Sequence, residues 1–208
     1  MSPCTRETIT PKACKAIRLS TVEHVAGAVP KPPEEILVLV DENDNQIGTD
    51  TRGNCHAGIG KRHRAFTVFL FHRGKLLLQQ RSKVKLLWPG AWDVSYTSHV
   101  YPGETYIQAA VRKGHQELHA EVVDLHDACS FVYFAPQGKN SENEFCRLLV
   151  GLFNGKVSPN PNEIMALKWV RIREAAEDLA ANPDAYTPWF RLSLEGFLRN
   201  PVSKEYGA

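Results

Sequence analysis

The sequence predicts an α/β or α+β protein in which a mixed β-sheet is flanked by a few helices. Short runs rich in β-branched and aromatic residues alternate with turn clusters along most of the chain. Helical patterns occur between these runs and again near the carboxyl end. The 208 residues also suffice for one sizeable hydrophobic core. We therefore expect a single α/β domain.

The bulk composition is that of an ordinary globular protein, with 43% hydrophobic and 23% charged residues. The formal net charge of +2 gives no argument for a nucleic-acid partner or an anionic membrane surface. No apolar run approaches the roughly 20 residues that a membrane span needs. The five cysteines are irregularly spaced and odd in number, which favours reduced thiols and a cytoplasmic location.

The first 35 residues show no clear periodicity and end in Pro30-Lys31-Pro32-Pro33. Three prolines in four residues are incompatible with a regular helix or strand. We predict that residues 1–35 form a tail and linker open to disorder, and that residues 36–208 form the folded domain.

The first half of that domain is predicted to be mainly strands. Residues 36–40 form an apolar run that precedes a cluster of turn-forming residues. Residues 65–71 and 75–80 are two further runs separated by Arg73-Gly74, which predicts a hairpin with a short turn. Another strand is predicted over residues 92–100.

The second half combines helices and strands. Thr105 is a suitable N-cap for a helix ending near Leu118, because the residues after it recur at helical spacing. Strands are predicted over residues 129–135 and 144–153, joined by a polar loop at residues 137–141. The remaining expected elements are a strand at 167–170 and helices at 172–181 and 189–199.

Three histidines and two glutamates have the residue types of a metal site. His56 and His63 are seven residues apart, and His99 follows the predicted hairpin. Glu142 and Glu144 are two apart in a predicted strand, so both carboxylates point to one face. Taken singly, each histidine can be an ordinary surface or hydrogen-bonded residue, and the two glutamates can belong to a solvated strand edge. Together, they match a nitrogen and oxygen set for one divalent transition metal, zinc or manganese.

A basic cluster surrounds the first two histidines and the end of the hairpin. Arginine and lysine on rigid elements are suited to a diphosphate, although the same composition also fits a solvated charged face. The predicted helix at 103–118 can add a carboxylate to a metal–phosphate complex. The basic residues are Arg52, Lys61, Arg62, Arg64, Arg81, Lys83 and Lys85.

Seven segments form an ordered pattern along the chain: Val40–Gly48, Asn54–His56, His63–Phe71, Leu76–Ser82, Trp88–Gly90, Glu142–Glu144 and Thr187–Phe190. This pattern resembles the type I isopentenyl diphosphate isomerases, which belong to the Nudix superfamily. The resemblance covers roughly residues 36 to 200. It implies the Nudix fold, an α/β/α sandwich around a mixed sheet, and an enzyme of isoprenoid biosynthesis.

The resemblance also implies roles for single residues. Glu144 with Tyr133 delivers a proton to the alkene, and Glu117 helps to hold magnesium on the diphosphate. Trp189 lies against the allylic cation, which an aromatic face stabilises by roughly 0.5–2 kcal/mol. The implied transition-metal ligands are His56, His63, His99, Glu142 and Glu144, and the implied diphosphate ligands are Arg52, Arg81, Lys85 and Lys113.

The chain departs from the family pattern at Thr97, which occupies the position of the family's catalytic cysteine. A thiol titrates near ~8.5 and exchanges a proton near neutral pH, whereas an alkyl hydroxyl needs a neighbouring base. Thr97 can hold a water but cannot replace a thiolate directly. Cys146 continues the face of Glu142 and Glu144, so we expect it in the core rather than as a substitute.

A second departure lies on the predicted helix. Lys113 and Gln116 occupy two of the three metal-binding carboxylate positions of Nudix pyrophosphohydrolases. Hydrolysis of nucleoside diphosphates needs several carboxylates to neutralise a magnesium cluster. The sequence therefore disfavours that activity.

These features predict a metal-dependent isomerase-type enzyme whose partner is a small-molecule isoprenoid diphosphate. Its default reaction is conversion of isopentenyl to dimethylallyl diphosphate. Two alternatives stay open. The proton-donating residues Tyr133 and Glu144 are retained although the cysteine is replaced by Thr97. This combination fits a protonation-initiated cyclase or rearranging enzyme for a longer prenyl diphosphate. The retained polar site also fits a non-catalytic prenyl diphosphate binder.

Overall fold

The computed structural model describes residues 34–122 and 124–207. The predicted tail therefore lies outside the described residues, apart from Glu34 and Glu35. Within the described part, nine strands form one mixed sheet. The strands are β1 (Ile36–Val40), β2 (Gln46–Thr51), β3 (His63–His72), β4 (Lys75–Arg81), β5 (Trp92–Asp93), β6 (Tyr96–His99), β7 (His126–Gln137), β8 (Asn140–Leu152) and β9 (Ile164–Val170). The helices are α1 (Arg52–His56), α2 (Tyr106–Leu118), α3 (Ile172–Ala181) and α4 (Pro188–Arg199), with short 3-10 helices η1 (Pro183–Ala185) and η2 (Pro201–Tyr206).

The central strand of the sheet is β3. β8 runs parallel to it along its length, and this register places His63 beside Glu144. β6 pairs antiparallel with the first half of β3, and β4 pairs only with its last two residues. β4 continues the sheet through β5 and β9, while β7 pairs with β8. The sheet is therefore mixed, as predicted.

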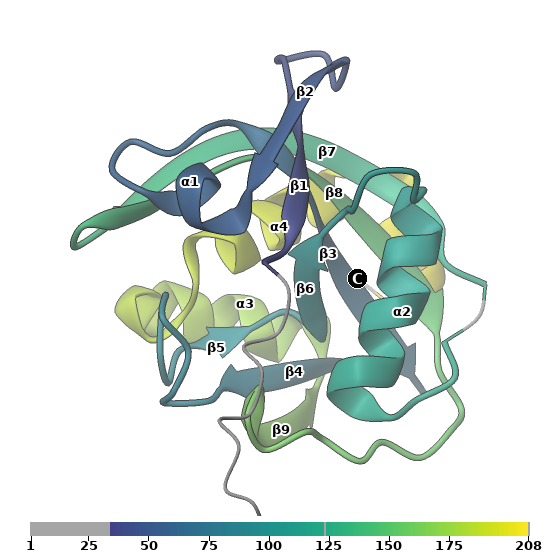
Figure 1. Cartoon of the computed structure of the whole chain (residues 1–208). Coiled ribbons are helices and arrows are strands. Elements are labelled where there is room, and N and C mark those ends of the chain that lie inside the picture. The colour runs from purple at the N-terminus through teal and green to yellow at the C-terminus, as the bar shows by residue number, and fades with distance from the viewer. Residues whose placement is uncertain (1–33, 123, 208) are drawn as a thin grey trace, which may run out of the picture. The chain divides into compact units, whose positions relative to one another are not determined.

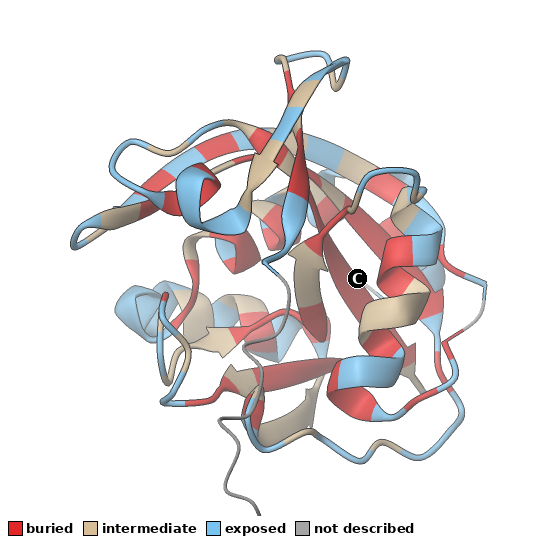
Figure 2. Ribbon diagram, in the orientation of Figure 1, coloured by how far each residue is buried: buried red, intermediate tan, exposed pale blue. Residues whose placement is uncertain are grey.

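Helices cover both faces of this sheet, which makes the domain an α/β/α sandwich (Figure 1). Phe66 and Val68 of β3 belong to the core cluster under α2, whereas Phe69 and Phe71 belong to the cluster under α3 and α4. Successive side chains of a strand point to opposite faces, so an almost wholly apolar strand supplies both cores. Figure 2 shows buried residues running along β3 and β8.

The predicted helices are confirmed, and α2 shows why its start could be recognised. The Thr105 hydroxyl accepts a hydrogen bond from the Gln108 backbone N–H at 3.2 Å. The Gln108 side chain accepts one from the Thr105 N–H at 2.8 Å. This reciprocal capping box satisfies two backbone donors that have no partner inside the helix. It fixes the residue at which α2 begins.

Some elements differ from the prediction. Residues 92–100 form two strands rather than one, because the chain leaves β4 after β5 and joins β3 as β6. The polar loop predicted at 137–141 is mostly strand. Only Gly138 and Lys139 lie between β7 and β8, and Gly138 adopts the positive φ of 63° that this tight turn requires. β2 and α1 were not predicted.

No helix among the described residues combines the length and the apolar character that crossing a bilayer requires. The cysteines for which the structure gives a description, Cys55, Cys129 and Cys146, are free thiols.

Candidate active site

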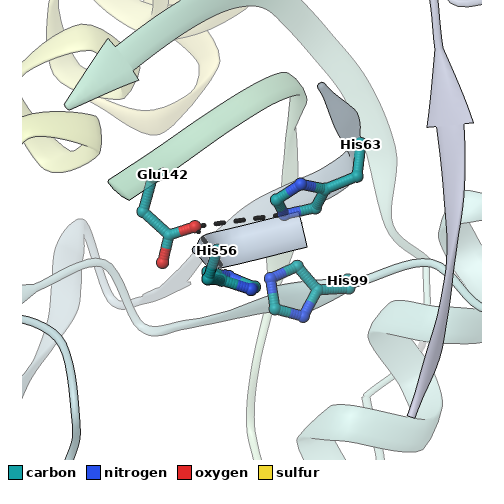
Figure 3. Close-up of side chains that lie close together, drawn as sticks. All are labelled: His56, His63, His99 and Glu142. Carbon is teal, nitrogen blue, oxygen red and sulfur yellow. Dashed lines mark ion pairs between the residues drawn. The ribbon is translucent and has the colours of Figure 1, made fainter. Parts of the chain in front are cut away.

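Four of the predicted metal ligands meet at one end of the sheet. His56 ends α1, His63 begins β3, His99 ends β6, and Glu142 lies on β8. One ligand atom from each lies within 4.8 Å of the others, and all four residues are buried. Figure 3 shows the four side chains converging on one point.

The backbone around these residues aims the imidazole rings inward. The Nδ1 atoms of His56 and His63 lie 2.7 Å from Arg52 O and 2.8 Å from Lys61 O. A carbonyl oxygen only accepts hydrogen bonds, so each Nδ1 carries a proton, and in the neutral ring each Nε2 keeps the lone pair that a metal can take. The segment between the two histidines turns at Gly60, where φ is 65° and an added Cβ would lie 2.8 Å from Cys55 O and from Ser141 Oγ.

The cluster fits a divalent cation, as judged from the atoms that face one another. The Nε2 lone pair of His56 lies 2.9 Å from Glu142 Oε2, which is also an acceptor. His56 Nε2, His63 Nε2 and Glu142 Oε2 are buried and have no hydrogen-bond partner among the described residues. Buried acceptors facing each other repel unless positive charge lies between them. Imidazole nitrogen and carboxylate oxygen are the ligands that zinc and manganese accept.

Glu144 lies beside this cluster, and its carboxylate and the cluster residues affect one another's pKa values. Its Oε1 lies 3.5 Å from the Nε2 atoms of both His63 and His99. Burial and the charge of Glu144 raise the pKa of Glu142, and the His56 imidazole opposes the rise. Burial also acts to raise the pKa of Glu144, but the imidazoles of His63 and His99 outweigh it and lower that pKa.

Tyr133 forms an acid pair with Glu144. The two residues lie directly opposite each other on β7 and β8. The phenol hydroxyl donates a hydrogen bond to Glu144 Oε2 at 2.6 Å. Burial and the Glu144 charge raise the pKa of Tyr133 well above its usual value. The phenol is therefore a neutral donor that holds a proton beside the carboxylate.

A polar cavity of about 120 Å³ opens beside these groups. Trp189 and Tyr133 contribute aromatic surface to it, and charged side chains contribute most of the rest. The combination suits a ligand with a small apolar part and a strongly charged part. The cavity is lined by Glu35, Arg52, Arg81, Lys85, Thr97, Ser98, His99, Lys113, Tyr133, Glu142, Glu144, Glu163 and Trp189.

The basic residues of the cavity form ion pairs with neighbouring glutamates. Glu163 is paired with Lys85 and lies 3.6 Å from the Lys113 ammonium. Lys113 also lies 3.0 Å from Glu117 on the same helix. Burial raises the pKa of Glu117, and its Oε2 has no hydrogen-bond partner among the described residues. Arg52, at the cavity rim, pairs with Glu35 at 3.4 Å. Glu117 itself lies just outside the cavity lining.

Arg81 lines the cavity, but several of its donors are engaged elsewhere. Its Nε and Nη2 donate to the carbonyl oxygens of Leu87 and Trp88, and its Nη1 donates to Asp93. The guanidinium thus fixes the loop that follows β4 while it faces the cavity. Asp93 and Glu163 were missed from the sequence. A charged residue inside the apolar run Trp92–Val94 was the available signal for Asp93.

Thr97 lines the cavity, whereas Cys146 does not. The Thr97 hydroxyl donates a hydrogen bond to the Phe66 carbonyl at 2.7 Å. A backbone carbonyl cannot take up that proton, so the hydroxyl has no base as its partner. Cys146 is fully buried in the core cluster under α3 and α4. Burial raises the pKa of its thiol well above the ordinary value.

The NUDIX domain model matches residues 61–190. A Serratia proteamaculans protein named isopentenyl-diphosphate Delta-isomerase is 37% identical over 173 residues, covering 82% of this chain and 96% of the relative. A relative of the same name from Streptomyces avermitilis is 39% identical, covering 77% of this chain and 82% of the relative. Isopentenyl-diphosphate Delta-isomerase 1 from Mus musculus is 37% identical, covering 79% of this chain and 82% of the relative.

Solved structures show the same fold. A crystal structure of a Deinococcus radiodurans protein superposes with a TM-score of 0.64 at 25% identity, covering 78% of this chain and 99% of that one. A MutT protein from Methanosarcina mazei superposes with a TM-score of 0.55 at 18% identity, covering 66% of this chain and 94% of that one.

Proposed function

This chain belongs to the Nudix domain family and, within it, to the isopentenyl-diphosphate Delta-isomerase family, and from this premise we propose that it converts isopentenyl diphosphate to dimethylallyl diphosphate. The observation that carries the proposal is the Tyr133–Glu144 hydrogen bond at 2.6 Å, which holds a proton at the wall of a cavity shared with Trp189. Isomerisation of an alkene requires addition of a proton at one carbon and removal of a proton from another.

The charged side of the cavity supports binding of the diphosphate. Arg52, Lys85 and Lys113 can place positive charge around its oxygens, and Arg81 keeps part of its guanidinium facing the cavity. His56, His63, His99 and Glu142 would hold a divalent ion, whose charge would help to fix Glu144 in one orientation. Glu117 would help to hold a magnesium ion that offsets the charge of the diphosphate.

The proton is delivered by the Tyr133–Glu144 pair. A positive charge then develops on the tertiary carbon of the substrate. Trp189, whose ring centroid lies 6.3 Å from that of Tyr133, presents an aromatic face that stabilises this charge. Trp189 and Tyr133 cover the cation on their side of the polar cavity and limit the access of water there.

Removal of the second proton depends on the side of the cavity that carries Thr97. Its hydroxyl is engaged with the Phe66 carbonyl, so it acts through its oxygen lone pairs or through a water that it holds. An alkyl hydroxyl is a weak base, and this step is expected to limit the rate of isomerisation.

Tyr133→Phe is expected to lower kcat about 100-fold, because it removes the phenol proton while leaving the ring in place. KM and metal content are expected to stay near those of the wild type, since the phenol is not among the groups assigned to the metal or the diphosphate. Steady-state kinetics and metal analysis check this. A variant with wild-type kcat would mean that the proton comes from another group.

A second candidate function is a protonation-initiated cyclisation or rearrangement of a longer prenyl diphosphate. Two observations favour it. The Thr97 hydroxyl has a carbonyl rather than a base as its partner, which suits a reaction that does not end with proton removal there. A second hollow of about 430 Å³ shares Tyr133 with the polar cavity and adds Trp88, Phe134 and Leu192 to its walls. It offers room for more carbon atoms.

A product screen separates these functions. Five-, ten- and fifteen-carbon diphosphates are incubated with the metal-loaded protein in D₂O, and the products are identified. Deuterated dimethylallyl diphosphate supports isomerisation, and deuterated cyclic or rearranged products from longer substrates support the second candidate. Tight binding without any product would indicate a non-catalytic binder and would contradict both.

A further inference from the structure

A buried carboxylate lies next to the cavity and takes no part in the proposed steps. Asp93, the last residue of β5, has no exposed surface. Its Oδ1 accepts hydrogen bonds from Val94 N at 2.8 Å, Thr187 Oγ1 at 2.9 Å and Trp189 Nε1 at 2.6 Å. Its Oδ2 accepts one from Arg81 Nη1 at 3.0 Å. All four partners are donors, so Asp93 acts only as an acceptor.

That donor set identifies Asp93 as an anion. Burial raises the pKa of this carboxyl group, while Arg81 and the other donors act in the opposite direction. A protonated carboxyl group would need an acceptor for its own hydrogen, and none of the four contacts provides one. Loss of the charge would also leave the Arg81 guanidinium without its carboxylate partner in a site that is almost fully buried.

The ring of Trp189 lies between opposing charges. The Arg81 guanidinium carbon is 5.2 Å from its centroid, and a cation at that distance draws on the electron density of the π-face. At the edge of the same ring, the indole N–H donates to the Asp93 carboxylate. A charge-assisted bond of this kind is strong, and it moves electron density from the N–H into the ring.

We infer that Asp93 is a positioning residue for the reaction, which fixes the Trp189 ring at the cavity wall and offsets the Arg81 charge so that the ring can stabilise a cation. The inference rests on the proposed function, because it assumes that positive charge develops on the substrate. Asp93 does not line the cavity, so it acts through Trp189 and Arg81 rather than on the substrate. Trp88 also packs against Trp189 in an edge-to-face arrangement, with ring centroids 5.0 Å apart.

The test compares two diphosphate probes, of which only one carries a cation. Inorganic diphosphate reports on the basic side of the cavity alone. A diphosphate ester of a two-carbon chain ending in a dimethylammonium group adds a fixed cation where the substrate charge would develop. Asp93→Asn keeps the size of the side chain and removes its charge. We expect it to weaken binding of the ammonium probe about tenfold, which corresponds to about 1.4 kcal/mol, and to change binding of inorganic diphosphate less than about twofold.

A matched control is Asp178→Asn. Asp178 on α3 also accepts hydrogen bonds from an aromatic hydroxyl, that of Tyr186, and from the Lys168 ammonium, but it lies outside the cavity. This variant is expected to bind both probes like the wild type. An NMR measurement adds a second readout. The indole N–H resonance of Trp189, assigned with Trp189→Phe, should move upfield in Asp93→Asn and stay in place in Asp178→Asn.

Each outcome bears on one claim. If wild-type protein binds the ammonium probe no better than inorganic diphosphate, the proposed cationic reaction is wrong. If the wild type prefers the ammonium probe and Asp93→Asn keeps that preference within about twofold, the role of Asp93 is wrong and the reaction stands. If Asp93→Asn cannot be purified, Asp93→Glu takes its place. That variant keeps the charge but displaces it from the indole, and an undiminished preference for the ammonium probe would overturn the inference.

Discussion

Replacement of His56 and His63 together by alanine is expected to abolish tight metal binding and, with it, all turnover. The two imidazoles supply two of the four ligand atoms that lie within 4.8 Å of one another. The remaining His99, Glu142 and Glu144 keep only one nitrogen ligand, so the metal content should fall from about one ion per chain to less than about a tenth. Elemental analysis of the purified variant measures this directly.

The controls for this experiment separate ligand loss from general damage. His115 and His126 are exposed, and their double replacement by alanine should leave the metal content unchanged. Thr97→Ala should also retain the metal, because Thr97 binds a backbone carbonyl rather than the cluster. The single variants His56→Ala, His63→Ala, His99→Ala and Glu142→Ala should each lower the content. Full occupancy after loss of both His56 and His63 would show that the ligand assignment is wrong.

Thr97→Cys is expected to raise the rate of conversion of isopentenyl to dimethylallyl diphosphate by about 100-fold or more, since a positioned general base contributes about 10²–10⁴. A thiolate can accept a proton near neutral pH, whereas the threonine hydroxyl has only the Phe66 carbonyl as its partner. The rate should rise with pH as the thiol ionises. Steady-state assays across a pH series test both expectations.

Thr97→Ser is the matched control, because it keeps the hydroxyl and its reach to the Phe66 carbonyl. It should behave like the wild type. A wild-type protein without isomerase activity that gains it through Thr97→Cys would show that isomerisation is not the native reaction, in favour of the second candidate function. Equal activity of wild type and Thr97→Cys would show that the base lies elsewhere.

Local signals predicted most of the fold. Thr105 and Gln108 lie three residues apart and form a capping box, so the start of α2 could be recognised without tertiary information. The five residues of α1 include Gly53 and show no helical period, so that helix depends on its neighbours. The strand break between β5 and β6 also had no local signal, because it arises where the chain changes its pairing partner from β4 to β3.

The candidate site was predicted where residue types were distinctive. Histidines and a Glu-x-Glu pair stand out in any sequence, and the structure brings them together. The charge of Asp93 inside an apolar run was a local signal, but its role could not be predicted because its partners Thr187 and Trp189 lie on another element far along the chain. The same is true of Glu163, which meets Lys85 and Lys113 only through the packing of β9 and α2.

The pairing of β7 with β8 limits how this site can change in evolution or by design. Tyr133 lies opposite Glu144, and the turn at Gly138 closes the hairpin. Residues added at the turn would extend both strands and leave this pair in place. One residue inserted between Tyr133 and the turn would instead rotate the phenol to the opposite face of the sheet, away from the carboxylate. The two strands of the hairpin can therefore lengthen only by equal numbers of residues. A hairpin lengthened in this way could extend over the cavity and still keep Tyr133 opposite Glu144.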